Sequence, residues 1–247
     1  MGRPFPASVS RAFWDTTAEW RSVYFHHLKS LDPTNLPAHL AADREFVIAE
    51  DAFVARQIAQ ADSAIVEFGC GIGRHLLPAA NRFPQKIFIG LDYSARQTSM
   101  FGHLLRDRKS TNTIPVTADV TYVPLATSTA DLVLMCYHTF GTILGAGRTR
   151  VLLEARRILR PGGRLYIGGF SNLDIAPLCY SSWGIQPREI NRDNGLITLD
   201  AYQSLWQDDA QINELLNNFS FDLEEHLPLE LGFLNVYLSR EDQTSDS

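Results

Sequence analysis

The chain has 247 residues, a formal net charge of −6, 45% hydrophobic residues and 20% charged residues. This length is sufficient for one main core with an added cap, so we expect one main domain. The acidic balance gives no basic field for a polyanion, which argues against nucleic acid as a partner and favours a small-molecule ligand. No apolar run approaches the roughly 20 residues that span a bilayer, and the first residues lack a signal-peptide core. We therefore predict no membrane association and a cytoplasmic location.

The chain has three cysteines, which are odd in number and widely spaced: Cys70, Cys136 and Cys179. This pattern predicts neither a disulfide framework nor a zinc site, and it favours a reducing compartment. The histidines at His26, His27 and His75 have no convincing metal spacing with carboxylates, so no metal is predicted.

The first sixty residues favour helices. Aromatic residues recur at helical spacing from Arg11 to Phe25, prolines mark a break at 33–37, and apolar residues follow near-helical intervals from Asp43 to Gln60. We interpret residues 1–60 as a helical N-terminal cap or lid.

From Ile65 onward, short β-branched runs alternate with longer amphipathic stretches, which is typical of βαβ units that build a mostly parallel sheet. The expected strands are 64–68, 86–91, 114–118, 131–137 and 163–170. The expected helices are 73–81, 95–105 and 148–159, and Pro161-Gly162-Gly163 ends the last of them. The main domain is expected to cover residues 61–240.

The last third of the chain is less regular. Residues 171–207 are rich in aromatics and lack periodicity, so we predict an irregular loop region that covers a pocket. A helix is expected at 208–217, and the runs FSFDLEEHLPLE and FLNVYLSR could then pair antiparallel at the sheet edge. The tail, 241–247, is expected to be disordered.

The stretch IVEFGCGIGRH places Gly69, Gly71 and Gly73 between the first strand and a helix, where bare backbone can approach a polar ligand. A dinucleotide fold uses G-x-G-x-x-G, but here the bulky cation Arg74 occupies the place of the third small residue. Glu67 at the strand end would repel a pyrophosphate. The expected ligand is therefore a nucleoside that lacks phosphates.

The stretch from Glu67 to Gly73 resembles the glycine motif of class I S-adenosylmethionine-dependent methyltransferases, and other family elements follow in order. Asp92 ends the next strand roughly 20 residues later, where an acidic residue can take both ribose hydroxyls. Asp119 and Val120 resemble the pair that meets adenine, the carboxylate at its amino group and the amide at its ring. The stretches ADLV (130–133) and ARRILRPGGRLYIG (155–168) resemble the family's fourth strand and its helix, turn and fifth strand. The resemblance covers roughly residues 60–170.

This resemblance implies an α/β fold with a Rossmann-like, seven-stranded, mostly parallel sheet, helices on both faces and a helical N-terminal cap. It implies S-adenosylmethionine as the cofactor and transfer of a methyl group to N or O of a small-molecule acceptor. The implied cofactor-binding residues are Tyr24, Glu67, Gly69, Gly71, Gly73, Asp92, Tyr93, Asp119, Val120 and Cys136. Taken singly, the glycines could form a mere tight turn, Asp92 could cap a helix, and Asp119 could be a turn residue.

The resemblance places the acceptor beyond the fourth strand, where the chain reads MCYHTFGTI. Amine methyltransferases of the glycine N-methyltransferase type have an asparagine in a similar stretch, and this chain has His138. As a catalytic residue, His138 could take a proton from the acceptor; the alternative is a strand-end histidine that is hydrogen-bonded to backbone. Cys136 is by position close to the cofactor, and as a buried thiol it is expected to be a small apolar filler.

Aromatic residues at both ends of the chain are further candidates. Trp14, Trp20 or Tyr24 could cover the methionine part of the cofactor, or could pack the cap onto the core. Arg21 and Arg74 could bind the cofactor carboxylate or an acidic substrate, or could be solvated charges. The late aromatics could wall the acceptor site or pack at the sheet edge: Tyr180, Trp183, Tyr202 and Trp206.

Two other functions remain possible from the sequence. A nicotinamide-dependent oxidoreductase could use a similar sheet, although Glu67 and Arg74 are unfavourable for phosphate contacts. A non-catalytic S-adenosylmethionine-binding protein is the second alternative, because methyl displacement needs no obligatory catalytic residue. We expect a monomer or a homodimer.

Overall fold

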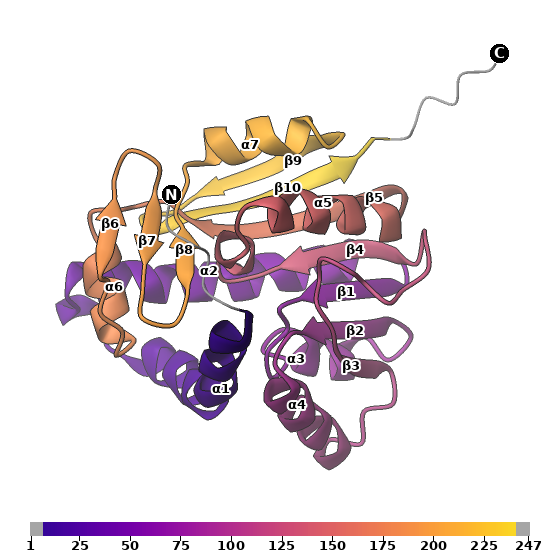
Figure 1. Cartoon of the computed structure of the whole chain (residues 1–247). Helices are drawn as coiled ribbons and strands as arrows, with labels where there is room; N and C mark the ends of the chain where they lie inside the picture. The colour runs from indigo at the N-terminus through magenta and orange to yellow at the C-terminus, as the bar shows by residue number, and fades with distance from the viewer. Residues whose placement is uncertain (1–6, 241–247) are drawn as a thin grey trace.

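The computed structural model describes residues 7–240, and for residues 7–10 and 18–22 it describes the backbone alone. Its centre is a seven-stranded sheet in the order β3-β2-β1-β4-β5-β10-β9 (Figure 1). The strands are β1 Ala64–Phe68, β2 Ile87–Asp92, β3 Thr113–Thr117, β4 Ala130–Met135, β5 Leu159–Phe170, β9 Phe221–Pro228 and β10 Gly232–Ser239. The first five run parallel, and β10 pairs antiparallel with both β5 and β9. The predicted mostly parallel sheet and its antiparallel edge are confirmed.

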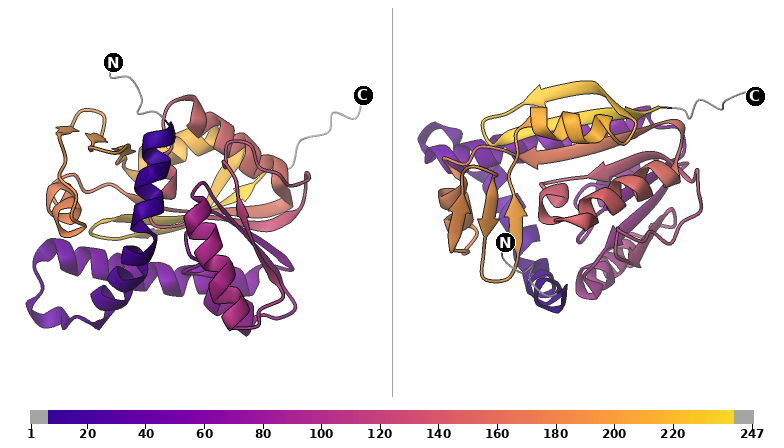
Figure 2. Two further views of the ribbon diagram at one scale, coloured as in Figure 1. Left: turned by 60° about the horizontal axis from the view of Figure 1, so that its bottom comes forward. Right: turned by 45° about the horizontal axis from the view of Figure 1, so that its top comes forward.

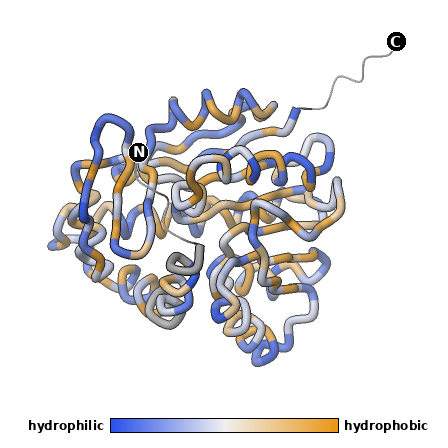
Figure 3. The backbone as a smooth tube through the Cα atoms, viewed as in Figure 1, coloured by the Kyte–Doolittle hydropathy of each residue, from blue (hydrophilic) through white to orange (hydrophobic). Residues whose placement is uncertain are grey.

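Helices cover both faces of the sheet. The side chains of β4 alternate, so that Leu132 and Leu134 enter one core while Val133 and Met135 enter the other. The first core is closed by α2 Ala38–Gln60, α3 Leu76–Arg82 and α4 Ala95–Asp107, and the second by α5 Ala146–Ile158 and α7 Asp209–Asn217. Figure 3 shows apolar stretches along the central strands and polar stretches on the outer loops.

The N-terminal region divides into two helices with different roles. After α1 Ala7–Ser30 and the short η1 Pro33–Asn35, α2 lies along the sheet (Figure 2), and it buries Phe46, Val47 and Phe53 there. The first helix instead reaches α4, where the Trp14 carbonyl accepts a hydrogen bond from Gln97 Nε2 at 3.1 Å. The first helix thus packs against the first core through Phe13 and Trp14 and does not lie along the sheet as α2 does.

Residues 171–207 are not irregular, so that prediction is wrong. They form α6 Ala176–Ser182 and a small antiparallel sheet of β6 Glu189–Asn191, β7 Leu196–Thr198 and β8 Gln203–Leu205. Three-residue strands are too short to show an alternating pattern, and this explains the error. Gly195 has a φ of +73°, and a Cβ there would lie 1.9 Å from the carbonyl oxygen of Trp206, so the turn before β7 requires glycine.

Some predictions for the two ends of the chain concern residues that the structure does not describe. The tail at 241–247 lies outside the described residues, as do the side chains of Trp20 and Arg21. Within the described part of the chain, no helix is long and apolar enough to cross a bilayer.

Candidate active site

Two cavities meet at the carboxyl ends of the parallel strands. Their volumes are about 420 and 400 Å³, within the usual range for small-molecule sites. The shared wall consists of Gly69, Gly71, Gln97, Tyr137 and Thr139. The glycine loop therefore borders both cavities.

The glycine loop offers bare backbone because side chains do not fit there. The φ values of Gly69, Gly71 and Gly73 are +71°, +55° and +84°, in the left-handed region that favours glycine. A Cβ on Gly73 would lie 2.2 Å from the ring of Phe101 in α4. The loop is also tied to β2, because the Gly69 amide donates to the carbonyl of Leu91 at 2.8 Å.

Asp92 points its carboxylate at the glycine loop from the end of β2. One oxygen accepts from the amide of Gly71 at 2.8 Å and the other from the amide of Ser94 at 2.9 Å. The hydroxyl of Ser94, and not Asp92, caps α4 by accepting from the amide of Gln97. A carboxylate oxygen can accept more than one hydrogen bond, so these two bonds do not by themselves exclude a ligand hydroxyl at either oxygen.

Asp119 and Val120 lie on the wall of the larger cavity, together with Tyr93 and Ala118. Asp119 Oδ1 accepts from the amide and the hydroxyl of Thr121, at 2.9 and 2.8 Å, which fixes the turn after β3. The structure thus gives Asp119 a turn role and also a place beside the cavity.

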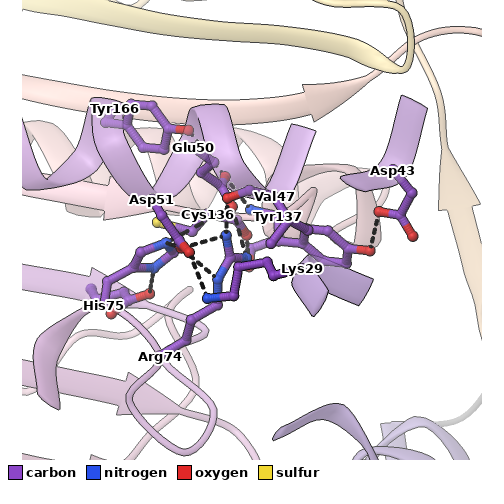
Figure 4. Close-up of polar contacts among 12 residues, drawn as sticks. Lys29, Asp43, Val47, Glu50, Asp51, Arg74, His75, Cys136, Tyr137 and Tyr166 are labelled. Carbon is purple, nitrogen blue, oxygen red and sulfur yellow. Dashed lines mark hydrogen bonds and ion pairs between the residues drawn. The ribbon is translucent and has the colours of Figure 1, made fainter. Parts of the chain in front are cut away.

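Beneath the glycine loop lies a buried ion cluster in which α2 faces the start of α3 (Figure 4). Arg74 pairs with Glu50 at 3.0 Å and with Asp51 at 2.8 Å. His75 Nδ1 lies 3.2 Å from Glu67 Oε1, and its Nε2 lies 3.4 Å from Asp51 Oδ1. These ion pairs link α2 to the glycine loop.

The cluster holds His75 in its charged form. Burial and the neighbouring Arg74 work against the charge, but hydrogen bonds to Asp51 and Glu67 raise the pKa of His75 to about 8. Burial also opposes ionisation of Asp51, yet His75, Arg74 and Lys29 hold its pKa well below the usual value. The cluster is therefore a balanced set of charges at neutral pH.

Three side chains of this region have the composition of a metal site. The ligand atoms of Glu67, His75 and Cys136 lie within 4.8 Å of one another. However, the cations of Lys29, Arg74 and His75 already pair with the three carboxylates of the cluster, and burial raises the pKa of the Cys136 thiol well above its usual value. These contacts explain the cluster without a metal ion, and Cys136 is a protonated thiol on the wall of the smaller cavity.

The comparisons with known proteins agree with this geometry. A family model described as a methyltransferase domain matches residues 65–163. The chain carries a class I S-adenosylmethionine-dependent methyltransferase domain. Its cofactor is S-adenosylmethionine, and a bend of bare glycine backbone beside a carboxylate fits the ribose of such a nucleoside.

Solved structures with low sequence identity share the fold of this methyltransferase domain. The Burkholderia thailandensis 1,6-didemethyltoxoflavin-N1-methyltransferase, solved with 1,6-didemethyltoxoflavin and S-adenosylhomocysteine, has a TM-score of 0.66 and 15% identity, over 98% of this chain and 94% of that one. The CcbJ methyltransferase from Streptomyces caelestis has a TM-score of 0.62 and 16% identity, over 85% and 98%.

One curated relative has higher identity over a shorter stretch. The Drosophila melanogaster tRNA N(3)-methylcytidine methyltransferase Mettl2 is 30% identical over 137 residues, which are 49% of this chain. The match spans 41% of the length of that relative.

Beyond the cofactor loop of the methyltransferase domain, His138 follows β4 in a left-handed conformation, as does Tyr137 before it. Its Nδ1 accepts from the amide of Phe170 at 3.0 Å, and its Nε2 lies 3.0 Å from the hydroxyl of Ser204. Burial, with a smaller effect of Arg148, lowers the pKa of His138 to about 3. This imidazole is therefore neutral at pH 7, with both ring nitrogens engaged by the protein.

The backbone bond assigns the tautomer of His138. Since Nδ1 accepts from an N–H group, the ring proton is on Nε2, which donates to Ser204. Of the two roles left open by the sequence, this geometry favours the hydrogen-bonded histidine, because a general base needs a free lone pair directed at the acceptor.

Tyr24 lies apart from the other predicted cofactor residues. It lines a third cavity of about 300 Å³, and in the described structure it contributes to neither of the two larger ones. Its hydroxyl donates to Asp43 Oδ2 at 2.5 Å. Tyr137 and Trp183 also donate to this carboxylate, at 2.7 and 3.1 Å, so that one buried aspartate joins four segments of the chain.

Several wall residues escaped the sequence analysis. Gln97, Thr139, Phe170 and Ser204 line the larger cavity, and Asp43 and Glu50 fix the wall residue Tyr137 from behind. Phe170 ends the fifth strand, where a parallel sheet places its ligand residues, and this position was the one available signal. Of the suggested late aromatics, Tyr180, Trp183 and Tyr202 line the cavity.

Proposed function

We propose that this chain transfers a methyl group from S-adenosylmethionine to N or O of a small-molecule acceptor. The observation that best supports this proposal is the larger cavity, which runs from the two carboxylates Asp92 and Asp119 to an uncharged aromatic wall. The half beside Asp92 and Asp119, here called the cofactor half, suits an adenosine. The half beside the aromatic wall, here called the acceptor half, suits a compact apolar acceptor. The names of the Burkholderia and Drosophila proteins both specify methylation of a nitrogen, which supports this reaction class.

The bound cofactor supplies an electrophilic methyl group on a positively charged sulfur. In this proposal Asp92 accepts hydrogen bonds from the ribose diol, and Asp119 and Val120 meet the adenine. The glycine loop lets the methionine and ribose parts of the cofactor lie close to β1. The chain's main task is then to align the acceptor atom with the methyl carbon and to exclude water.

The cofactor assignment is tested by calorimetry with S-adenosylhomocysteine. We expect Asp92→Ala to bind it at least tenfold more weakly than the wild type, because two charge-assisted hydrogen bonds are lost. Asp222→Ala is the matched control, because this aspartate lies on the edge strand β9 and pairs with Arg240. Equal affinity of Asp92→Ala and the control would remove the ribose assignment.

A second candidate acceptor is an RNA base, because the Drosophila relative is named for N3 methylation of cytidine in tRNA. The net charge of −6 opposes it, since RNA binding requires a basic surface. Incubation with labelled S-adenosylmethionine, with either a tRNA transcript or a metabolite panel, separates the two. Cofactor binding without turnover on any acceptor would favour the non-catalytic alternative.

A further inference from the structure

The part of the larger cavity beyond the glycine loop is bounded by aromatic rings and hydroxyls. Its residues come from the segment after β4, the end of β5, α6 and its C-terminal end, and β8, and include Tyr137, His138, Phe170, Tyr180, Trp183 and Ser204. Among the described residues that line the whole cavity there is no lysine or arginine. The cavity therefore offers no cationic side chain to an anionic acceptor, whereas its rings can contact a neutral or a cationic one.

The aromatic rings of this wall pack on one another. The ring of Phe170 is buried and stacks on His138 at 4.6 Å, Tyr137 stands edge-on to it at 5.1 Å, and Trp183 lies 6.0 Å from it at an angle of 33°. Tyr137 also belongs to the wall that the two cavities share. A flat aromatic molecule can contact the half-buried rings of Tyr137 and Trp183 by stacking and edge contacts.

The described residues of this wall provide no side chain with a lone pair available to act as a general base. His138 is the one imidazole of the lining, and its Nδ1 is occupied by the amide of Phe170. Alkyl amines are mainly protonated at neutral pH, and phenols hold their proton, so both need a base before they can attack. A pyridine-type ring nitrogen is neutral and carries its lone pair in the ring plane, ready for in-line attack.

We propose that the acceptor is a flat heteroaromatic molecule without a negative charge that is methylated on a ring nitrogen. This inference rests on the proposed methyl-transfer function. The ring nitrogen forms the new N–C bond with its lone pair while the C–S bond breaks, and the electron pair of that bond stays on sulfur. The positive charge passes to the ring, which keeps it or loses an N–H proton to water.

The charge requirement is tested on protein loaded with S-adenosylhomocysteine, by calorimetry with three probes of one shape. These are quinoline, quinoline-4-carboxamide and quinoline-4-carboxylate. We expect quinoline and the carboxamide to bind at least tenfold more tightly than the carboxylate, because a buried anion without a partner is unfavourable. Binding of the carboxylate as tightly as the carboxamide would overturn the inference.

The design separates the two proposals. Failure to bind S-adenosylhomocysteine itself would contradict the methyl-transfer function. Normal binding of S-adenosylhomocysteine together with no binding of any of the three probes would contradict only the acceptor class.

The role of the flat wall is tested by two variants of Trp183. Trp183→Phe and Trp183→Leu both lose the N–H that donates to Asp43, but only the leucine variant loses the aromatic face. We expect quinoline to bind about three- to tenfold more weakly to the leucine variant than to the phenylalanine variant. Equal affinity for quinoline in the two variants would exclude stacking on this ring.

The nucleophile is tested by methyl incorporation from labelled S-adenosylmethionine. We expect quinoline to accept the label faster than benzylamine or 1-naphthol. A faster reaction of benzylamine or 1-naphthol would contradict the ring-nitrogen assignment. Incorporation into a tRNA transcript, with none into the free heterocycle, would move the acceptor from a small molecule to RNA.

Discussion

Two histidines mark the difference between the proposed cofactor half and the proposed acceptor half of the site. His75 lies below the glycine loop among carboxylates, and these raise its pKa to about 8. His138 lies behind the aromatic wall, where burial lowers its pKa to about 3. Both rings are almost fully buried, so it is the charge of the neighbours, and not burial alone, that decides the protonation state.

The two halves also differ in how they are built. The cofactor half consists of a continuous loop, the ends of adjacent strands and balanced ion pairs. The acceptor half is assembled from segments that lie far apart in the sequence and carry rings and hydroxyls. The first arrangement suits a ligand whose polar groups have fixed positions. The second suits a flat ligand that is contacted on the faces of its rings.

The largest predicted effect concerns His138 in acid. Its folded-state pKa of about 3 lies below the usual 6.5, so the unfolded chain binds the extra proton first, and stability falls as the pH drops from 6.5 to 3. This shift corresponds to about 5 kcal/mol at pH 3. Urea unfolding at pH 7 and at pH 3 to 4 should show a smaller loss in His138→Gln than in the wild type. Parallel losses would contradict the neutral, buried imidazole.

A second prediction concerns the bare backbone of the cofactor half. Gly73→Ala should lower the free energy of unfolding by about 1–2 kcal/mol for the left-handed conformation. The contact with Phe101 should lower it by about 1–3 kcal/mol more. Gly162→Ala is the control, because its φ is +71° and a Cβ there meets nothing within 4 Å. Denaturant titration of both variants measures the difference, and equal losses would show that the loop tolerates a side chain.

The smallest predicted effect concerns His75 in base. Its folded-state pKa of about 8 lies above the usual 6.5, so its contribution is complete below pH 6.5 and is lost as the pH rises through 8. The shift corresponds to about 2 kcal/mol. Unfolding at pH 6 and pH 9 should therefore show this loss in the wild type, and His75→Gln should lack it. If both proteins respond equally to the alkaline change, the charged form of His75 is excluded.

Much of the cofactor half could be predicted because its signals are local. The five parallel strands are short apolar runs, and Gly69, Gly71 and Gly73 are required by backbone angles that follow from the turn itself. The family resemblance also ordered Asp92 and Asp119 correctly along the strand ends. Their contacts with the cofactor stay a prediction.

The acceptor half could not be predicted in the same way. Phe170, Trp183 and Ser204 meet only in the folded chain, and the strands of the small sheet have three residues each. Asp43 and Glu50 look like ordinary charges on an amphipathic helix, and nothing in their spacing reveals that they are buried. The sequence likewise left two roles for His138, because a ring's hydrogen-bond partners depend on segments that are distant along the chain.

Tyr137 lies where all three cavities adjoin, and α2 holds it at two points. Glu50 accepts from its amide at 2.7 Å, and Asp43 accepts from its hydroxyl at 2.7 Å. Under the proposed function, α2 therefore holds the wall residue that lies between the cofactor and the acceptor. Changes in that helix should consequently alter turnover more than they alter the affinity for either partner.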